Sequence, residues 1–134
     1  MAEDMERAKD VLRKGYEAFN RGDFDESADY LHPDVDWHRV ADVEQSLEGR
    51  DAVRGNMEPE VWTKQQVELH GMEVIGESIV LDTTFHAEGA GSGIEINQTG
   101  YHLWKIKDGM GARFQFFNER DEAVRAAREQ EGMT

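Results

Sequence analysis

The sequence predicts an α+β fold in which helices come first and one antiparallel sheet follows. Residues 3–19 repeat apolar side chains at every third or fourth position, which is the spacing of an amphipathic helix. From about residue 65 onward, β-branched and aromatic residues alternate with polar ones between glycine-rich turns, a pattern typical of strands. We therefore expect a single long, curved sheet that wraps on the N-terminal helices and leaves a cone with an open mouth.

Shorter patterns place the elements of the N-terminal half. The first helix should end at Gly22 in the left-handed conformation, and Asp23 with Glu26 forms a capping box for a second short helix. Pro33 is expected to close that second helix. The segments that follow are predicted as a strand at 35–39, a polar loop at 41–48 and a third helix at 50–57.

The second half is expected to be mostly strand. Predicted strands cover residues 65–75, 79–88, 94–106 and 111–117, and a last helix covers 120–129. The glycine-rich residues 89–93 join two strands, so they form a hairpin turn and not a phosphate loop, which needs a helix and a Lys-Ser/Thr ending. No linker or internal repeat interrupts the chain, so residues 1–134 are expected to form one domain.

The candidate site lies on the hairpin at residues 98–117, whose turn contains Asp108 and Gly109. Side chains alternate between the two faces of a strand, so His102 and Trp104 share one face. A regular hairpin adds side chains of the return strand to that face, namely Arg113, Gln115 and Phe117. Tyr101, Leu103, Phe114 and Phe116 are then expected on the other face.

We predict His102 and Arg113 as catalytic residues, because histidine can act as acid or base near neutrality and arginine can stabilise an enolate or carboxylate oxygen. A core histidine and a salt-bridged arginine in a vestigial cavity are the structural alternative, which stays open. The predicted ligand-binding residues are Trp37, Arg39, Met57, Trp62, Trp104, Gln115 and Phe117.

The composition limits the kinds of partner and cofactor that we expect the protein to bind. With 29 acidic against 15 basic residues, the formal charge of −14 argues against nucleic acid or an anionic membrane. There are no cysteines, and the five histidines lack metal-ligand spacing, so neither a metal nor another cofactor is expected. No apolar run approaches the roughly 18 residues of a membrane span, and the N-terminus lacks signal-peptide character. We expect a soluble, cytoplasmic protein.

Four motifs in the same order resemble the SnoaL-like branch of the NTF2-like superfamily, which includes polyketide cyclases. They are Phe19–Phe24, His32–Trp37, Glu48–Val53 and His102–Gly109. The resemblance covers nearly the whole chain and implies a cone-shaped α+β barrel, commonly a homodimer. Because the superfamily contains both enzymes and ligand-binding proteins, the fold does not decide the chemistry.

The resemblance also tests one activity. A steroid isomerase of this superfamily needs an aspartate base and two donors, a tyrosine and a protonated aspartate, to an enolate. Here the resemblance places the tyrosine position on Gly15, with Tyr16 turned about 100° away. The base falls on Arg39 and the second donor on His102. The resemblance therefore argues against a steroid isomerase.

The function expected is binding of a small, partly apolar, oxygen-bearing molecule in the cone, with cofactor-free turnover of the aldol-cyclase or isomerase type. The alternative is a non-catalytic, dimeric ligand-binding or assembly protein.

Two further expectations concern the outer face of the sheet. Asp82 and His86 are expected there, although the reverse parity would make Asp82 a base inside the cone. The homodimer is expected to form through the same face, which would bury Tyr101, Leu103, Phe114 and Phe116.

Overall fold

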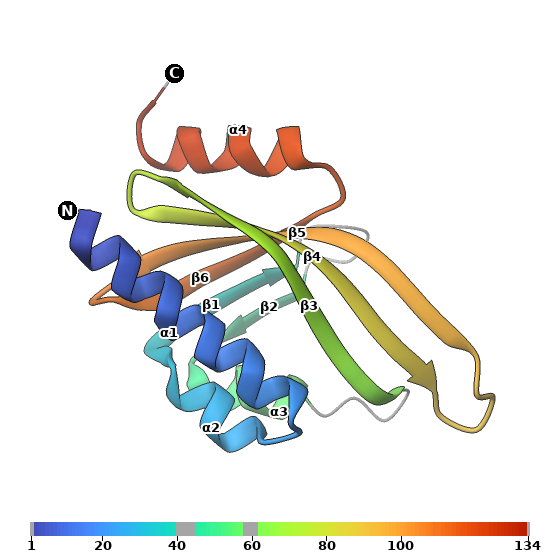
Figure 1. Cartoon of the computed structure of the whole chain (residues 1–134). Coiled ribbons are helices and arrows are strands. Elements are labelled where there is room, and N and C mark those ends of the chain that lie inside the picture. Colours follow the sequence, from blue (N-terminus) through green and yellow to red (C-terminus); the bar gives the residue numbers. More distant parts are fainter. Residues whose placement is uncertain (1, 40–44, 58–61, 134) are drawn as a thin grey trace.

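The structure, a computed structural model, describes residues 2–39, 45–57 and 62–133. Its elements are α1 (Ala2–Asn20), α2 (Phe24–Asp29), β1 (Leu31–Arg39), β2 (Gln45–Glu48), α3 (Arg50–Asn56), β3 (Trp62–Ile75), β4 (Ser78–Gly89), β5 (Glu95–Lys107), β6 (Met110–Phe117) and α4 (Arg120–Gln130). The strands form one curved sheet in the order β2-β1-β6-β5-β4-β3 (Figure 1). The pair β1–β6 is parallel and the other pairs are antiparallel. The predicted α+β layout is confirmed.

The N-terminal helices follow the predicted caps in part. Gly22 has a φ of 81°, and the Asp23 side chain accepts a hydrogen bond from the backbone N–H of Glu26 at 3.1 Å. The second half of the capping box is not formed, because the Asp23 N–H donates to the backbone oxygen of Ala18 and the Glu26 carboxylate pairs with Arg21. Two further details differ from the prediction. Pro33 lies within β1, because the second helix has already ended at Asp29. Residues 45–48, predicted as part of a loop, form β2 and pair with β1, while 41–44 lie outside the described residues.

The hairpin of β5 and β6 contains a β-bulge that the sequence pattern does not reveal. Its turn is formed as predicted, with Asp108 and Gly109 at φ values of 54° and 75°. Ile106 pairs with Gly111, but the next residue back along β5, Lys105, pairs with Arg113. Ala112 is therefore an extra residue on β6, and it exchanges the two faces of that strand beyond this point.

The bulge overturns part of the predicted site. His102 now lies opposite Phe116, and Trp104 lies opposite Phe114. The prediction that three residues of β6 share the face of His102 is wrong, because one extra residue shifts the alternation by one. The residues that it moves to the opposite face are Arg113, Gln115 and Phe117.

Two apolar clusters cover the two faces of the sheet. The inner cluster joins α1 and α3 to the concave face and includes Leu12, Val53, Ile79, Trp104 and Phe114. The outer cluster lies beneath α4, on the opposite side from α1 (Figure 1), and consists of Val80, Leu103, Ala123 and Ala127 with partly buried neighbours. The sheet therefore separates an interior, which holds the candidate site, from a second core under α4.

The helix α4 removes the reason given for the predicted dimer. Leu103 is 1% exposed beneath α4, and Tyr101 packs against the same outer cluster. Phe114 is buried in the interior and Phe116 packs there as well. The prediction that these four side chains form an exposed patch is wrong, since the chain covers them itself.

The end of α4 is held to the sheet by Glu131. Its carboxylate accepts hydrogen bonds from the backbone N–H of Glu77 at 2.6 Å and from the Ser78 hydroxyl at 3.1 Å, and it also pairs with the Lys105 ammonium. Burial raises the pKa of Glu131, but these hydrogen bonds outweigh burial and leave the pKa below its ordinary value. The carboxylate is thus a charged anchor for the C-terminal helix.

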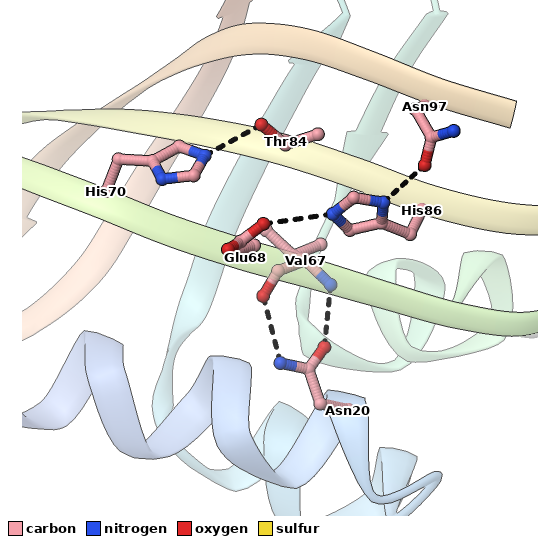
Figure 2. A network of polar contacts seen from close by, with 7 residues as sticks. All are labelled: Asn20, Val67, Glu68, His70, Thr84, His86 and Asn97. Atoms are coloured by element: carbon pink, nitrogen blue, oxygen red, sulfur yellow. Dashed lines mark hydrogen bonds and ion pairs between the residues drawn. The ribbon is translucent and has the colours of Figure 1, made fainter.

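The outer face also carries His70 of β3 and His86 of β4, whose contacts are drawn in Figure 2. His86 lies between Glu68, at 3.0 Å, and Asn97, and hydrogen bonds with Asn97 and Glu68 raise its pKa. His70 is 2.7 Å from the Thr84 hydroxyl. Because Leu81 pairs with the inward-facing His102, its neighbour Asp82 points outward with Thr84 and His86. This confirms the expected parity of β4 and excludes Asp82 as a base in the interior.

The side chain of Asn20 hydrogen-bonds α1 to the edge of the sheet. The Asn20 amide nitrogen donates to the backbone oxygen of Val67 at 2.9 Å, and its carbonyl accepts from the Val67 N–H at 2.7 Å (Figure 2). Val67 lies on β3, which is the last strand of the sheet. The amide of Asn20 thereby pairs with an edge strand as a neighbouring strand would.

Candidate functional site

A chain of two hydrogen bonds forms the polar centre of the interior. The Trp104 indole Nε1 donates to the Tyr16 hydroxyl oxygen at 2.9 Å. The same hydroxyl lies 2.6 Å from Nδ1 of His102. The three residues come from α1 and from the inner face of β5, so the chain connects a helix to the sheet. We call these residues the Trp104–Tyr16–His102 group.

The phase of α1 decides which residue reaches the sheet. Leu12 is buried in the inner cluster, and Tyr16 follows it by four residues on the same helical face. Gly15 faces α2 instead, because a Cβ at this position would lie 3.6 Å from Cβ of Tyr30. Tyr16, and not Gly15, therefore reaches the inner face of the sheet.

Aromatic rings surround the polar centre. The Phe114 ring contacts the His102 ring edge-on, with the centroids 4.9 Å apart. Trp37 stacks on Phe114 at 4.0 Å and meets Trp104 edge-on at 6.3 Å. The Phe116 ring lies 5.9 Å from His102 on the other side. These contacts place the imidazole in an apolar frame of aromatic rings.

Burial determines the protonation states of Tyr16 and His102. Enclosure by protein atoms lowers the pKa of His102 to about 3 and raises the pKa of Tyr16, with the Trp104 hydrogen bond opposing the second shift. Both groups are thus neutral near pH 7. Each residue nevertheless keeps part of its surface accessible, so the pair is desolvated without being sealed off.

The second ring nitrogen of His102 has no partner in the described part of the chain. Within that part, the fully buried polar side-chain atoms that lack a hydrogen-bond partner are Asp36 Oδ1 and Arg113 Nε. Nε2 of His102 is not among them, so it keeps accessible surface. The hydrogen-bond chain therefore ends at a ring nitrogen that is not fully sealed and has no hydrogen-bond partner in the described part of the chain.

The remaining predicted site residues are divided between the two faces. Trp37 and Met57 pack on the inner cluster. Trp62, the first residue of β3, contacts Phe85 of β4 edge-on, with the ring centroids 6.4 Å apart. Arg39 ends β1, and its side chain lies outside the described residues.

The outer face holds three other predicted site residues. Arg113 Nε is 3.7 Å from Asp36, Gln115 bonds with Gln130 of α4, and Phe117 packs on the outer cluster. The structure therefore places Trp37 and Trp104 on the same side of the sheet as His102, where both contact Phe114, and it places Arg113, Gln115 and Phe117 on the opposite face.

Sequence reasoning missed three residues of the site: Tyr16, Phe114 and Phe116. The two phenylalanines were misplaced by the bulge at Ala112, for which the sequence gives no signal. Tyr16 could have been found, because it continues the apolar stripe of Leu12 on α1.

The described residues contain no group of three or more His, Asp or Glu side chains arranged to hold a metal ion. No helix among them is both long and apolar enough to cross a membrane.

Gly111 makes room for the indole, which leads to a first prediction. A Cβ at Gly111 would lie 2.6 Å from the Trp104 ring, closer than such atoms approach. Gly111→Ala must therefore displace the indole, and we expect it to lower the free energy of unfolding by about 1–3 kcal/mol. Urea unfolding followed by circular dichroism measures this.

Gly55→Ala is the matched control, because a Cβ at Gly55 on α3 meets nothing within 4 Å. Alanine favours helix over glycine, so this variant should gain up to about 1 kcal/mol. Equal stability of Gly111→Ala and the wild type would show that the close approach to Trp104 is unimportant.

Comparison with known proteins identifies the family. The family model described as the SnoaL-like domain matches residues 12–114. The chain belongs to the SnoaL-like domain family. The matched segment of this SnoaL-like protein contains Tyr16, His102, Trp104 and Phe114. No curated protein matches the chain.

Solved structures show the same fold. An NTF2-like protein of unknown function from Burkholderia pseudomallei is 23% identical, with a TM-score of 0.73 over 89% of this chain and 95% of that one. TerC, co-crystallised with polyporic acid, is 15% identical, with a TM-score of 0.73 over 91% and 98%. A putative polyketide cyclase from Xanthomonas campestris pv. campestris is 20% identical, with a TM-score of 0.70 over 92% and 98%. The SnoaL-like protein thus has the predicted NTF2-like fold.

Proposed function

We propose that this SnoaL-like protein binds a small, partly apolar, oxygen-bearing molecule against the Trp104–Tyr16–His102 group. The observation that carries the proposal is the accessible, unpartnered Nε2 of a histidine that is otherwise enclosed by aromatic rings. Ligand sites in proteins commonly combine apolar walls with a few placed polar groups. Phe114 and Phe116 are the phenylalanine rings that contact His102, and Trp37 stacks on Phe114. His102 supplies the polar contact.

A related structure supports the chemical class of ligand. TerC, which shares the fold, was crystallised with polyporic acid. That molecule is a dihydroxyquinone that carries phenyl rings, so it joins apolar surface to oxygen-bearing groups. It is a suitable first probe for this protein.

A second candidate is cofactor-free turnover of the cyclase or isomerase type. One observation favours it: two neutral, desolvated hydrogen-bonding groups, Tyr16 and His102, stand together. Neutral donors in an apolar site stabilise a developing enolate oxygen. Such turnover also needs a base, and no described carboxylate is hydrogen-bonded to His102. Binding is therefore the function that the geometry supports best.

Titration with polyporic acid tests the proposal, with quenching of tryptophan fluorescence as the signal. We expect saturable binding that Tyr16→Phe weakens about 5- to 30-fold, because removing the hydroxyl breaks both hydrogen bonds of the group. Tyr30→Phe is the matched control, since Tyr30 lies on the far side of Gly15, against α1. Failure of polyporic acid to saturate the protein, or equal weakening in both variants, would contradict the proposed site.

A further inference from the structure

We infer that Trp104 is a positioning residue that fixes His102 as an Nε2–H donor, so that the ligand group held there is a hydrogen-bond acceptor. The acceptor is a carbonyl, enolate or carboxylate oxygen. This inference deepens the proposed function and rests on it for the ligand, while the state of His102 is a property of the unliganded chain.

The first step concerns the direction of the hydrogen bonds. An indole N–H can only donate, so the Tyr16 oxygen must accept the bond from Trp104 at 2.9 Å. The hydroxyl has one proton, and its remaining described partner is Nδ1 of His102 at 2.6 Å. Tyr16 therefore donates to His102.

The second step concerns the imidazole. A neutral histidine carries one proton, and Nδ1 is the acceptor of the Tyr16 bond, so the proton is on Nε2. With a proton on Nδ1 instead, Tyr16 would have to accept from both Trp104 and His102. Its own proton would then have no acceptor among the described residues. Trp104 adds to this preference, because its N–H occupies the acceptor site of the Tyr16 oxygen that an Nδ1–H of His102 would otherwise use.

The third step concerns what Nε2–H can do. The atom is accessible and has no partner in the described chain. A donor in such a position gains a hydrogen bond from a ligand oxygen with a free lone pair. It cannot accept a proton or a ligand hydroxyl at Nε2. The arrangement therefore excludes His102 as a general base through Nε2 and selects acceptors.

Nuclear magnetic resonance of the full, ¹⁵N-labelled chain at pH 7 tests the tautomer directly. We expect the two ring nitrogens of His102 to report one neutral tautomer, with Nε2 protonated and Nδ1 unprotonated. A dominant Nδ1–H tautomer, or a doubly protonated ring, overturns the inference.

Two variants test the role of Trp104. Trp104→Phe keeps an aromatic ring but removes the donor, so Tyr16 becomes free to accept from His102 and both tautomers should be populated. Tyr16→Phe removes the link itself and should have the same effect on His102. A His102 that remains wholly in the Nε2–H form in either variant shows that Trp104 and Tyr16 do not set it.

The ligand class is tested with a matched pair, duroquinone and its reduced form durohydroquinone, with oxygen excluded. The two share a carbon skeleton, but the quinone presents only acceptors whereas the hydroquinone presents hydroxyl donors. We expect the quinone to bind about fivefold more tightly or better, a preference that Trp104→Phe reduces. Equal affinities overturn the ligand class. Absence of binding by duroquinone, durohydroquinone and polyporic acid counts against the proposed function and leaves the tautomer result standing.

Discussion

Replacing Leu103 by glutamate should remove most of the stability of the protein. Leu103 is 1% exposed and is enclosed by Val80 and by Ala123 and Ala127 of α4. A carboxylate at this place must either stay charged without a partner or take up a proton, and both are costly in an apolar core. We expect a loss above about 4 kcal/mol out of a total of about 5–15 kcal/mol for a domain of this kind. Urea unfolding measures the loss.

Leu103→Met is the matched control, because it keeps the volume and the apolar character and should cost less than about 1.5 kcal/mol. If Leu103→Glu instead gave a well-folded protein of unchanged stability, the position of α4 over β5 would be wrong. Homodimerisation itself stays a prediction, and sedimentation at low and high ionic strength tests it independently of Leu103.

Acid should destabilise the protein through His102. The pKa of this histidine is about 3 in the folded chain, compared with an ordinary value of 6.5. Between these two values the unfolded chain binds a proton at His102 that the folded chain does not. Stability therefore falls as the pH is lowered from 6.5 toward 3, by at most about 1.4 kcal/mol per pH unit. Partial accessibility of the ring makes this slope an upper limit.

His102→Asn separates this contribution from the others. The asparagine carbonyl can accept the Tyr16 bond as Nδ1 does, but it does not titrate. Glu131 acts in the same direction, since its lowered pKa gives stability that is lost on acidification. Urea unfolding at pH values from 7 to 4 should thus show a shallower pH dependence in His102→Asn than in the wild type. Identical slopes would mean that His102 keeps an ordinary pKa in the folded protein.

The sequence was sufficient for the fold and for half of the site, and the division has a physical reason. Alternation along β5 correctly placed His102 and Trp104 inward and Leu103 outward, because nothing interrupts the ladder between β4 and this part of β5. The same rule failed on β6, where one extra residue, Ala112, reverses the parity. Bulges depend on how two strands meet, and a pattern read along one strand does not contain that information.

The prediction of the site residue on α1 failed for a different reason. The apolar stripe of α1 includes Tyr16, whereas alignment by family motif pointed to Gly15. The phase of a helix relative to a sheet depends on its packing against neighbouring helices, here α2 beside Gly15. Periodicity within the chain was the better guide to which residue enters the interior.

The pairing of Asn20 with Val67 bears on the behaviour of the protein in concentrated solution. An edge strand with free backbone groups is a template on which another chain can add a strand, which is a route to aggregation. In this fold the side chain of Asn20 occupies both backbone groups of Val67 and so blocks that template at one point of β3. Asn20 therefore hinders the addition of a strand from another molecule at this point, in addition to joining the first helix to the sheet.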